Sequence, residues 1–101
     1  MALFLIRRHV PAATQEDIDA AAVRAIACAL EFPGLRWITS YWDRAAEETL
    51  CMYEAKSAQE IAEHARRARI ACDEVRPVEQ FGPIDYVSGA EPPAEGGGAQ
   101  R

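Results

Sequence analysis

The sequence predicts an α+β fold built from four strands and two helices in the order strand–helix–strand–strand–helix–strand. Two stretches with apolar residues at three- and four-residue steps are typical of amphipathic helices, and four short runs rich in aliphatic, aromatic and β-branched residues are typical of strands. The chain has 101 residues, of which 50% are hydrophobic, and this size corresponds to one domain with a single core. We expect the domain to span residues 1–81 and a disordered or extended tail to span 82–101.

The first strand is predicted from the continuous apolar run Leu3–Ile6, which is typical of a central strand buried on both faces. The polar residues Arg7, Arg8 and His9 are expected to end this strand. Pro11 follows and excludes further pairing, because proline has no N–H to donate to a ladder.

The first helix is predicted to begin after Thr14, because Thr14 followed by Asp17 is a helix N-terminus signature. Its apolar stripe comprises Ile18, Ala22, Ala25, Ile26 and Ala29. The many alanines suit a helix that lies close on a sheet. Phe32-Pro33-Gly34 is expected to stop the helix.

The next two strands are predicted over Leu35–Trp42 and Thr49–Glu54, joined by the polar loop Asp43–Glu48. The loop is short enough for a hairpin, although it contains no glycine. We place the centre of the hairpin near Arg44 and Ala45, which sets the pairing of the two strands.

This register places Cys51 opposite Thr39 and Tyr53 opposite Trp37. One face of the hairpin would carry Trp37, Thr39, Tyr41, Cys51 and Tyr53, and the other would carry Ile38, Ser40, Trp42, Leu50 and Met52. We expect the more aliphatic second set to pack against the helices and the amphipathic first set to form a dimer interface or a cleft. His9 would lie at the same end of the sheet as Tyr53, and a slip of one residue would reverse the two faces.

The second helix is predicted from Ser57 to about Arg69, because Ser57 and Glu60 have the spacing of a capping box. Its buried stripe comprises Ile61, Ala65 and Ala68, with His64 beside it. An imidazole at this position could bind a metal or carry a proton, and hydrogen bonding to a carbonyl or to water is an equal alternative.

The last strand is predicted over Glu74–Phe81, and Pro77 within it indicates an edge strand. The composition changes at Gly82. The segment Glu91–Arg101 has no apolar content to bury, so we expect it to be disordered.

This order of elements is the ferredoxin-like, or split β-α-β, pattern. We expect an antiparallel four-stranded sheet with both helices on one face, and within it the first and third strands side by side and parallel. The other face of the sheet would be uncovered in a monomer. We therefore expect a homodimer.

Composition excludes several classes of function. The net charge of −5 disfavours nucleic acid as a partner, and the basic cluster Arg66, Arg67 and Arg69 is expected to be a solvated helix face. The apolar run Met1–Ile6 is too short for a signal peptide or a membrane span. Three cysteines without CxxC spacing argue against a disulfide framework or a structural zinc site. We expect a cytoplasmic protein.

The candidate residues for chemistry are Cys51, His64, His9, Tyr41 and Tyr53. Each also has a structural explanation, since buried cysteines commonly act as small apolar groups and tyrosines commonly pack at interfaces. No Ser-His-Asp order, glycine-rich phosphate loop or HExxH pair occurs, so an enzyme is not supported. Mixed nitrogen, oxygen and sulfur ligands would suit nickel, copper or zinc without choosing among them.

Several segments resemble one family of small proteins. They are Leu3–Pro11, Trp37-Ile-Thr-Ser-Tyr41, Cys51-Met-Tyr-Glu-Ala55, Glu63-His64-Ala65-Arg66 and Glu74-Val75-Arg76-Pro77. Over Ala2–Val78 the chain resembles the small actinobacterial nickel-binding, ferredoxin-like proteins, most of whose members are known as a domain of unknown function.

The resemblance implies a dimeric α+β sandwich, nickel binding in at least one member and no established catalytic reaction. Its motif positions are Tyr41, Cys51, Tyr53 and His64, to which we add His9 as a further candidate metal ligand. The chain departs from the family at residues 69–72, where a Gly-Leu-Pro turn is usual. Without that turn we expect the second helix to run longer and to shift the last strand.

The leading hypothesis is therefore a homodimer that binds nickel for sequestration or sensing without catalysis. The alternative is a dimeric α+β barrel that binds a small organic ligand in a cleft beside Trp37, Tyr41, Tyr53 and Cys51, as a binding protein or an auxiliary enzyme. A third hypothesis is a structural, partner-binding dimer. If Cys51 and Tyr53 face the helices with His64, a shared metal site is geometrically open; if they face away, the cleft is favoured.

Overall fold

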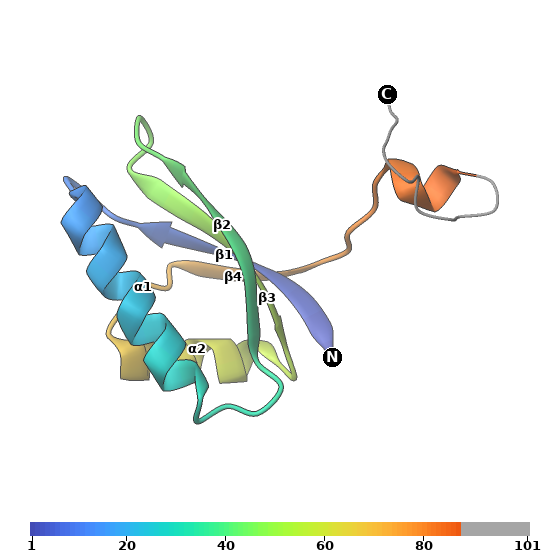
Figure 1. The fold of residues 1–101 in the computed structure, drawn as a ribbon, viewed down its shortest axis with the longest axis horizontal. Helices are drawn as coiled ribbons and strands as arrows, with labels where there is room; N and C mark the ends of the chain where they lie inside the picture. The colour runs from blue at the N-terminus through green and yellow to red at the C-terminus, as the bar shows by residue number, and fades with distance from the viewer. Residues whose placement is uncertain (88–101) are drawn as a thin grey trace.

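The computed structural model describes residues 1–87, which form a four-stranded antiparallel sheet with two helices on one face (Figure 1). The elements are β1 (Ala2–His9), α1 (Gln15–Ala29), β2 (Arg36–Asp43), β3 (Glu48–Ala55), α2 (Ala58–Ala68), β4 (Glu74–Val78) and a short 3-10 helix η1 (Pro83–Tyr86). This order confirms the predicted ferredoxin-like fold. The segment Glu91–Arg101, which is expected to be disordered, lies outside the described residues.

The strands are ordered β2-β3-β1-β4, so β1 and β3 are neighbours as predicted. They run antiparallel, however, with Phe4 opposite Tyr53 and Ile6 opposite Cys51, and the prediction of a parallel pair was wrong. The helical crossover through α1 returns β2 in the direction of β1, and the hairpin then reverses β3. The last strand β4 lies at the edge, as Pro77 indicates, but it ends at Val78 instead of Phe81.

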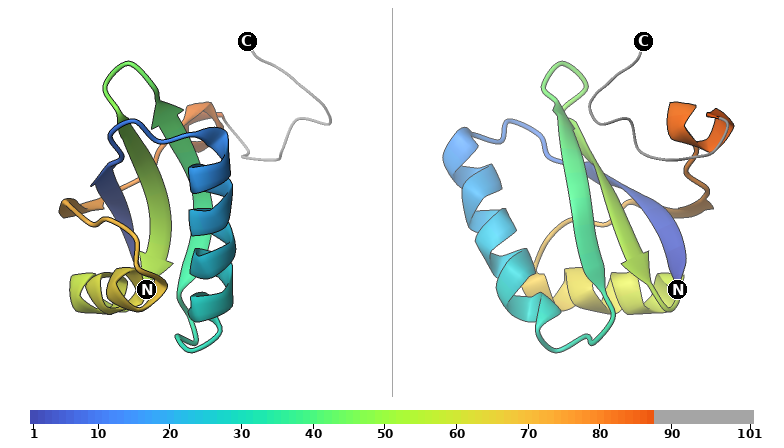
Figure 2. Two further views of the ribbon diagram at one scale, coloured as in Figure 1. Left: turned by 90° about the vertical axis from the view of Figure 1, so that its left-hand side faces the viewer. Right: turned by 45° about the vertical axis from the view of Figure 1, so that its right-hand side comes forward.

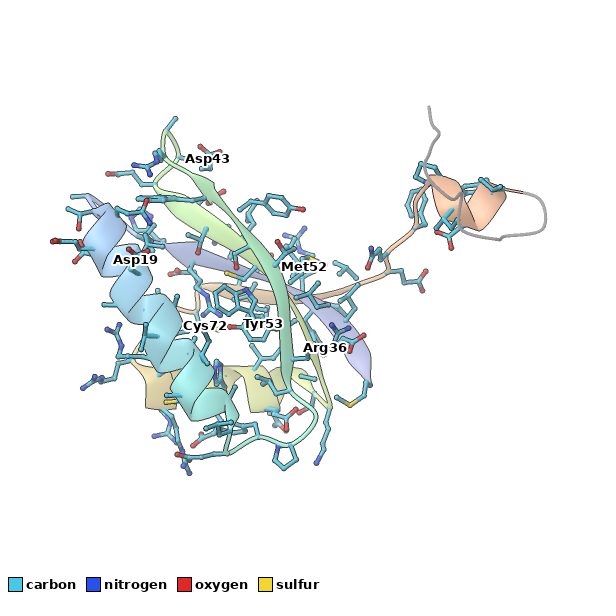
Figure 3. All side chains as sticks on the ribbon, in the orientation of Figure 1. Asp19, Arg36, Asp43, Met52, Tyr53 and Cys72 are labelled. Atoms are coloured by element: carbon cyan, nitrogen blue, oxygen red, sulfur yellow. The ribbon has the colours of Figure 1, made fainter. Side chains whose placement is uncertain are left out.

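The core lies between the sheet and the helices. It comprises Phe4, Ile6, Leu35, Cys51, Tyr53, Ala55 and Ile61. Figure 3 shows Tyr53 and Cys72 in this layer. The strand β1 buries only the alternating residues of one face, which continue through Arg8. The expectation of a strand buried on both faces and ended by Arg7 was therefore wrong, because no layer of the described chain covers the second face.

A β-bulge at Ile38 changes the register of the hairpin. Trp37 lies opposite Tyr53 as predicted, but the pairing then shifts, and Ser40 instead of Thr39 lies opposite Cys51. The extra residue in β2 turns every later side chain of that strand to the other face. The bulge re-aims only the later residues of β2. Cys51 and Tyr53 face the helices together with Trp37, and the predicted assignment of the two faces was wrong.

The opposite face of the sheet carries Leu50 and Met52, which were expected in the core and are half-buried there. Tyr41, the pairing partner of Leu50, is 63% exposed on this face, which agrees with its expected position away from the helices. The alternation along β3 explains the exchange, since Thr49, Cys51, Tyr53 and Ala55 are buried and the residues between them are not.

Helix α1 begins with the predicted cap. The amide of Asp17 donates to the Thr14 hydroxyl (3.1 Å), and the amide of Thr14 donates to the Asp17 carboxylate (2.9 Å). These bonds lower the pKa of Asp17. Of the predicted stripe, Ala25 is buried but Ile26 is exposed.

The same helix packs mainly against α2 and makes few contacts with the strands. Figure 2 shows α1 running alongside the sheet while α2 crosses below it. The expectation that the alanines bring α1 close to the sheet was wrong. Bulky side chains such as Trp37 and Tyr53 rise from the sheet, and the methyl groups of α1 do not fill the space between them.

Helix α2 begins at the predicted cap, where Ser57 Oγ accepts from the amide of Glu60 (3.1 Å). The predicted stripe is buried, and His64 is buried with it. The helix ends at Ala68 because Arg69 adopts a left-handed conformation (φ 58°). The expectation of a longer helix was wrong, since Arg69 takes the conformation that glycine usually provides at a helix end.

The basic cluster of α2 lies on the surface of the molecule. Arg66 and Arg67 are exposed and pair with Glu63, and Arg67 also pairs with Glu31, so the basic cluster is a solvated helix face as predicted. All three cysteines are free. Within residues 1–87, every helix is too short or too polar to cross a membrane.

Candidate ligand-binding cavity

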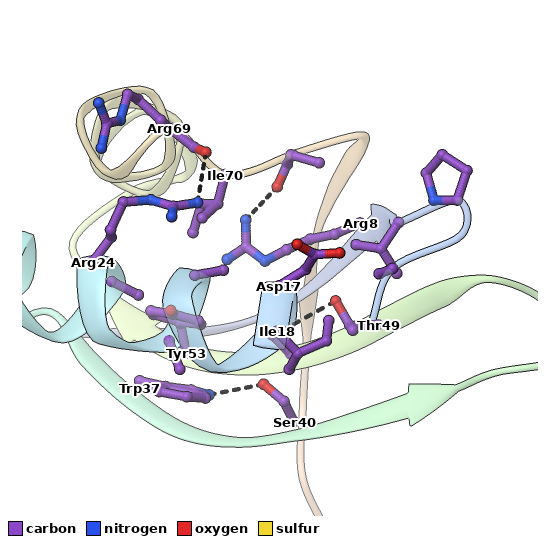
Figure 4. A pocket seen from close by; sticks show the side chains of 18 residues that line it. Arg8, Asp17, Ile18, Arg24, Trp37, Ser40, Thr49, Tyr53, Arg69 and Ile70 are labelled. Carbon is purple, nitrogen blue, oxygen red and sulfur yellow. Dashed lines mark hydrogen bonds between the residues drawn. The ribbon is translucent and has the colours of Figure 1, made fainter. Parts of the chain in front are cut away.

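A cavity of about 330 Å³ lies between α1 and the sheet (Figure 4). One wall of the cavity is the helix-facing side of the sheet. The residues that line this wall are Arg8, Trp37, Ser40, Thr49, Cys51 and Tyr53. The roof of the cavity is α1, which contributes small residues such as Ala21 and Ala22, and one side is closed by Ile70 and Ala71 after α2. The cavity exists because α1 stands away from the strands.

An aromatic pair forms the central part of the sheet-side wall of the cavity. The rings of Trp37 and Tyr53 stack across the β2–β3 pair, with centroids 6.3 Å apart and planes inclined by 11°. The Trp37 indole N–H donates to Ser40 Oγ at 2.8 Å. The bulge at Ile38 makes this bond possible, because residues three apart in a regular strand point to opposite faces. The wall is therefore flat, apolar and held in one orientation.

Arg8 places a positive charge at the sheet-side wall of the cavity, although the residue is only 4% exposed. Its Nη1 donates to the carbonyl oxygen of Ala71 at 2.5 Å, and its Cζ lies 5.7 Å from the centre of the Tyr53 ring. Its Nη2 is buried and has no hydrogen-bond partner within the described residues.

Tyr53 is a neutral phenol at the cavity wall. Burial raises its pKa to about 12, and the neighbouring Arg8 charge only partly opposes this effect. The hydroxyl therefore stays protonated over the physiological range and is available as a hydrogen-bond donor.

His64 lies in the core behind this wall and is 0% exposed. Its Nε2 donates to the carbonyl oxygen of Ala25 in α1 (2.9 Å), because a carbonyl can only accept. Its Nδ1 is buried without a partner. The ring packs between Phe32 (5.7 Å) and Tyr53 (5.8 Å), measured between ring centroids.

The five predicted metal ligands do not come together. Cys51, Tyr53 and His64 lie on the helix-facing side, whereas Tyr41 projects from the other face. His9 is exposed opposite Glu48, beside the hairpin loop, while Tyr53 lies opposite Phe4. The expectation that His9 and Tyr53 share one end of the sheet was wrong, because β3 runs antiparallel to β1.

The residues that do converge do not fit a complete nickel site. Nowhere in residues 1–87 do three or more His, Cys, Asp or Glu side chains form a group that could hold a metal ion. The Cys51 thiol contacts the hydroxyl of Thr49 (3.8 Å), and the cation nearest the Tyr53 ring is Arg8. A positive guanidinium at this position opposes a divalent cation electrostatically.

The cavity lies on the helix-facing side of the sheet, whereas the cleft was expected on the face away from the helices. Three of the four residues named for the cleft, Trp37, Tyr53 and Cys51, line the cavity. Tyr41 lies outside it. The sequence-based prediction missed Arg8 as a cavity residue. The signal was the alternation Phe4, Ile6, Arg8, which places Arg8 on the same face as two core residues once β1 is taken through to His9.

Comparison with known proteins identifies the family. The family model described as "Nickel responsive protein SCO4226-like" matches residues 4–78. The chain belongs to this family. Membership confirms the predicted resemblance, and the family's name refers to a response to nickel.

The solved structure of SCO4226 from Streptomyces coelicolor A3(2) has the same fold, with a TM-score of 0.71. The two sequences are 21% identical, and the match covers 80% of this chain and 100% of that chain. Among curated proteins there is no significant match to the chain.

Proposed function

We propose that this chain is a binding protein that holds a small organic molecule in the cavity between α1 and the sheet. The observation that carries the proposal is the cavity of about 330 Å³ with the stacked pair Trp37 and Tyr53 as its wall. This volume lies within the range of small-molecule sites, which combine an apolar lining with a few polar groups. A flat, apolar molecule fits such a wall.

The arrangement of polar groups supports binding rather than catalysis. The Cys51 thiol contacts the Thr49 hydroxyl, and the His64 Nε2 is engaged with the Ala25 carbonyl. A nucleophilic cysteine needs a base within hydrogen-bond reach, and the imidazole that could serve is turned toward α1.

Nickel binding is the second candidate, supported by the family's name. His64 is buried on the helix side of the sheet, with its Nε2 donating to the Ala25 carbonyl, so a copy docked on the opposite face cannot share a metal ion with it. One copy of residues 1–87 supplies too few ligands, so nickel would require donors from a second copy at a site that does not include His64.

We propose a homodimer that uses the face of the sheet opposite the helices. That face carries Leu3, Leu5, Tyr41, Leu50 and Met52 at its centre. Ion pairs such as Arg36–Glu54 and Arg7–Glu74 lie around them, which is the pattern of an apolar interface with a polar rim. Three free cysteines suit the reducing cytoplasm, where we place the protein.

The cavity proposal is tested with naphthamide, a neutral and flat probe. Ala22 faces the cavity and Ala20 is exposed on the same helix, so Ala22→Phe fills the cavity and Ala20→Phe is the matched control. We expect saturable shifts of cavity amide resonances in the native protein and in the control. Binding to Ala22→Phe should be at least about tenfold weaker, because the added ring occupies the site.

Two results would contradict the proposal. One is the absence of saturable naphthamide binding by the native protein. The other is equal affinity of the native protein and the folded Ala22→Phe variant, since the probe would then bind elsewhere.

A further inference from the structure

The unpaired charge of Arg8 identifies the class of ligand. We propose that the molecule held in the cavity is an organic carboxylate, with its anionic group on Arg8 Nη2 and its flat body against Trp37. The inference rests on the proposed function and adds the charge of the ligand to it. It follows from three observations: a buried cation without a counter-ion, a positive lining and a neutral donor beside the cation.

The first observation is that Arg8 has no counter-ion among residues 1–87. The ion pairs in residues 1–87 involve Arg7, Arg36, Arg66, Arg67 and Arg76. Buried arginines are almost always paired, because removing a charge from water costs several kcal/mol unless an opposite charge compensates. Asp73 follows the Arg8 contact at Ala71 by two residues, but its carboxylate accepts from the amide of His9 (2.6 Å).

The second observation is the sign of the charge around the cavity. Arg8, Arg24 and Arg69 line it, and Asp17 is the only acidic residue among the lining residues of the described chain. Arg24 donates to the carbonyls of Ala68 (2.8 Å) and Arg69 (3.3 Å), which holds its charge at the cavity edge. The chain as a whole carries −5, so this positive lining is a local feature that favours an anion.

The third observation is the donor beside Arg8. The Tyr53 phenol is neutral because burial raises its pKa to about 12. It therefore adds no negative charge that could serve as the counter-ion of Arg8. A carboxylate has two oxygens, and an arginine N–H with a neutral hydroxyl beside it provides donors for both.

The test compares two probes of one shape, naphthoate and naphthamide, by calorimetry. Native protein should bind naphthoate at least about tenfold more tightly, because its carboxylate accepts charge-assisted hydrogen bonds from Arg8. Arg8→Gln should lose this preference, which is measured as the ratio of the two affinities within the same variant. Arg8→Lys retains the charge and should keep part of the preference. Arg36→Gln, on an exposed arginine, should behave as native.

The outcomes separate the two proposals. If naphthamide binds in the cavity and naphthoate is not preferred, the carboxylate inference fails and the proposed function stands. If neither probe binds, both fail. A preference for naphthoate that persists in Arg8→Gln overturns the inference, because a group other than Arg8 would then bind the carboxylate of naphthoate. The comparison of the two probes on native protein decides the matter even if Arg8→Gln does not fold.

Discussion

Three polar side chains are buried on the helix-facing side of the sheet or against it: Arg8, Thr49 and His64. Each has a hydrogen bond, but Arg8 and His64 both keep one nitrogen without a partner among residues 1–87. Unsatisfied buried groups are rare because each costs about 1–3 kcal/mol. Both side chains lie close to the Tyr53 ring, at 5.7 Å and 5.8 Å from its centre, so the two costs fall in one part of the core.

Tyr53 provides a prediction about pH. Its pKa is about 12 in the folded chain against 10.0 for the free side chain, so its proton is held more tightly in the folded state. The stability that depends on this proton is complete below pH 10 and is lost as pH rises toward 12. We expect the free energy of unfolding to fall by about 2 kcal/mol over this interval, measured by urea denaturation.

The loss should be smaller by this amount in Tyr53→Phe, which has no proton to release. Tyr41→Phe removes an exposed hydroxyl and should follow the native curve. If the native protein and Tyr53→Phe lose stability equally between the two pH values, the buried phenol is not the cause.

At the scale of elements, the end of α2 contains local strain. Arg69 has φ 58°, and a residue with a Cβ atom in this conformation costs about 1–2 kcal/mol. Two backbone hydrogen bonds offset this cost. The amide of Arg69 donates to the Arg66 carbonyl, and the amide of Ile70 donates to the Ala65 carbonyl, which completes the C-terminal cap.

Replacement of Arg69 by glycine should relieve this strain. We expect Arg69→Gly to raise the free energy of unfolding by about 1 kcal/mol, since glycine adopts positive φ without a steric penalty. Ala62→Gly in the exposed interior of α2 is the matched control and should lower it by about 1 kcal/mol. Chemical denaturation of both variants measures the two changes, and destabilisation by Arg69→Gly would contradict the assignment of strain.

The elements themselves could be predicted because their signals are local. Thr14 with Asp17 and Ser57 with Glu60 mark the beginnings of both helices, and Pro77 marks the edge strand. The bulge at Ile38 could not be predicted, since no glycine marks it. Its position depends on how Trp37 and Ser40 pack against β3, which is a tertiary contact. This one residue separated Thr39 and Tyr41 from Trp37, with which they were expected to share a face.

At the scale of the whole molecule, the sheet has one face covered by helices and one face that no described element covers. The uncovered face carries apolar residues from adjacent strands, and large exposed apolar patches commonly mark interfaces. A second copy placed there would bury Met52 and Tyr41 together. Both copies would keep their cavities, because each cavity opens on the other side of the sheet.

Met52→Asp should therefore separate the dimer, since it buries an unpaired carboxylate in the interface. Light scattering should give twice the 11.1 kDa of one chain for native protein and a single-chain mass for the variant. Val23→Asp, at an exposed position of α1, should remain dimeric. If nickel binds through two copies, calorimetric titration of chelator-treated protein should show binding by native protein and loss of it in Met52→Asp.

A native mass of one chain at micromolar concentration would refute the dimer. Equal nickel affinity in native protein and monomeric Met52→Asp would refute a site shared between copies.

The candidate site could be predicted only in part. Trp37, Tyr53 and Cys51 could be grouped from the sequence, but their cleft was expected on the face away from the helices, not on the side where they line the cavity. Arg8 was not predicted because an arginine after an apolar run is normally the end of a strand. The cavity itself depends on the distance between α1 and the sheet, which is determined by the packing of α1 on α2 through bonds such as Arg24 to Ala68. The pattern of residues along the sequence does not determine the distance between α1 and the sheet.

The bulge at Ile38 also has an evolutionary consequence. It divides β2 into two parts whose inward positions are odd before it and even after it, as Trp37 and Ser40 show. A relative that lacks Ile38 would keep Trp37, Ser40 and Trp42 on the inner face, because removing the bulged residue restores a regular alternation without changing the pairs on either side of it. Deletion of that one codon would therefore leave the cavity wall in place, whereas a variant that kept the residue but lost the bulge would turn Ser40 and Trp42 to the other face.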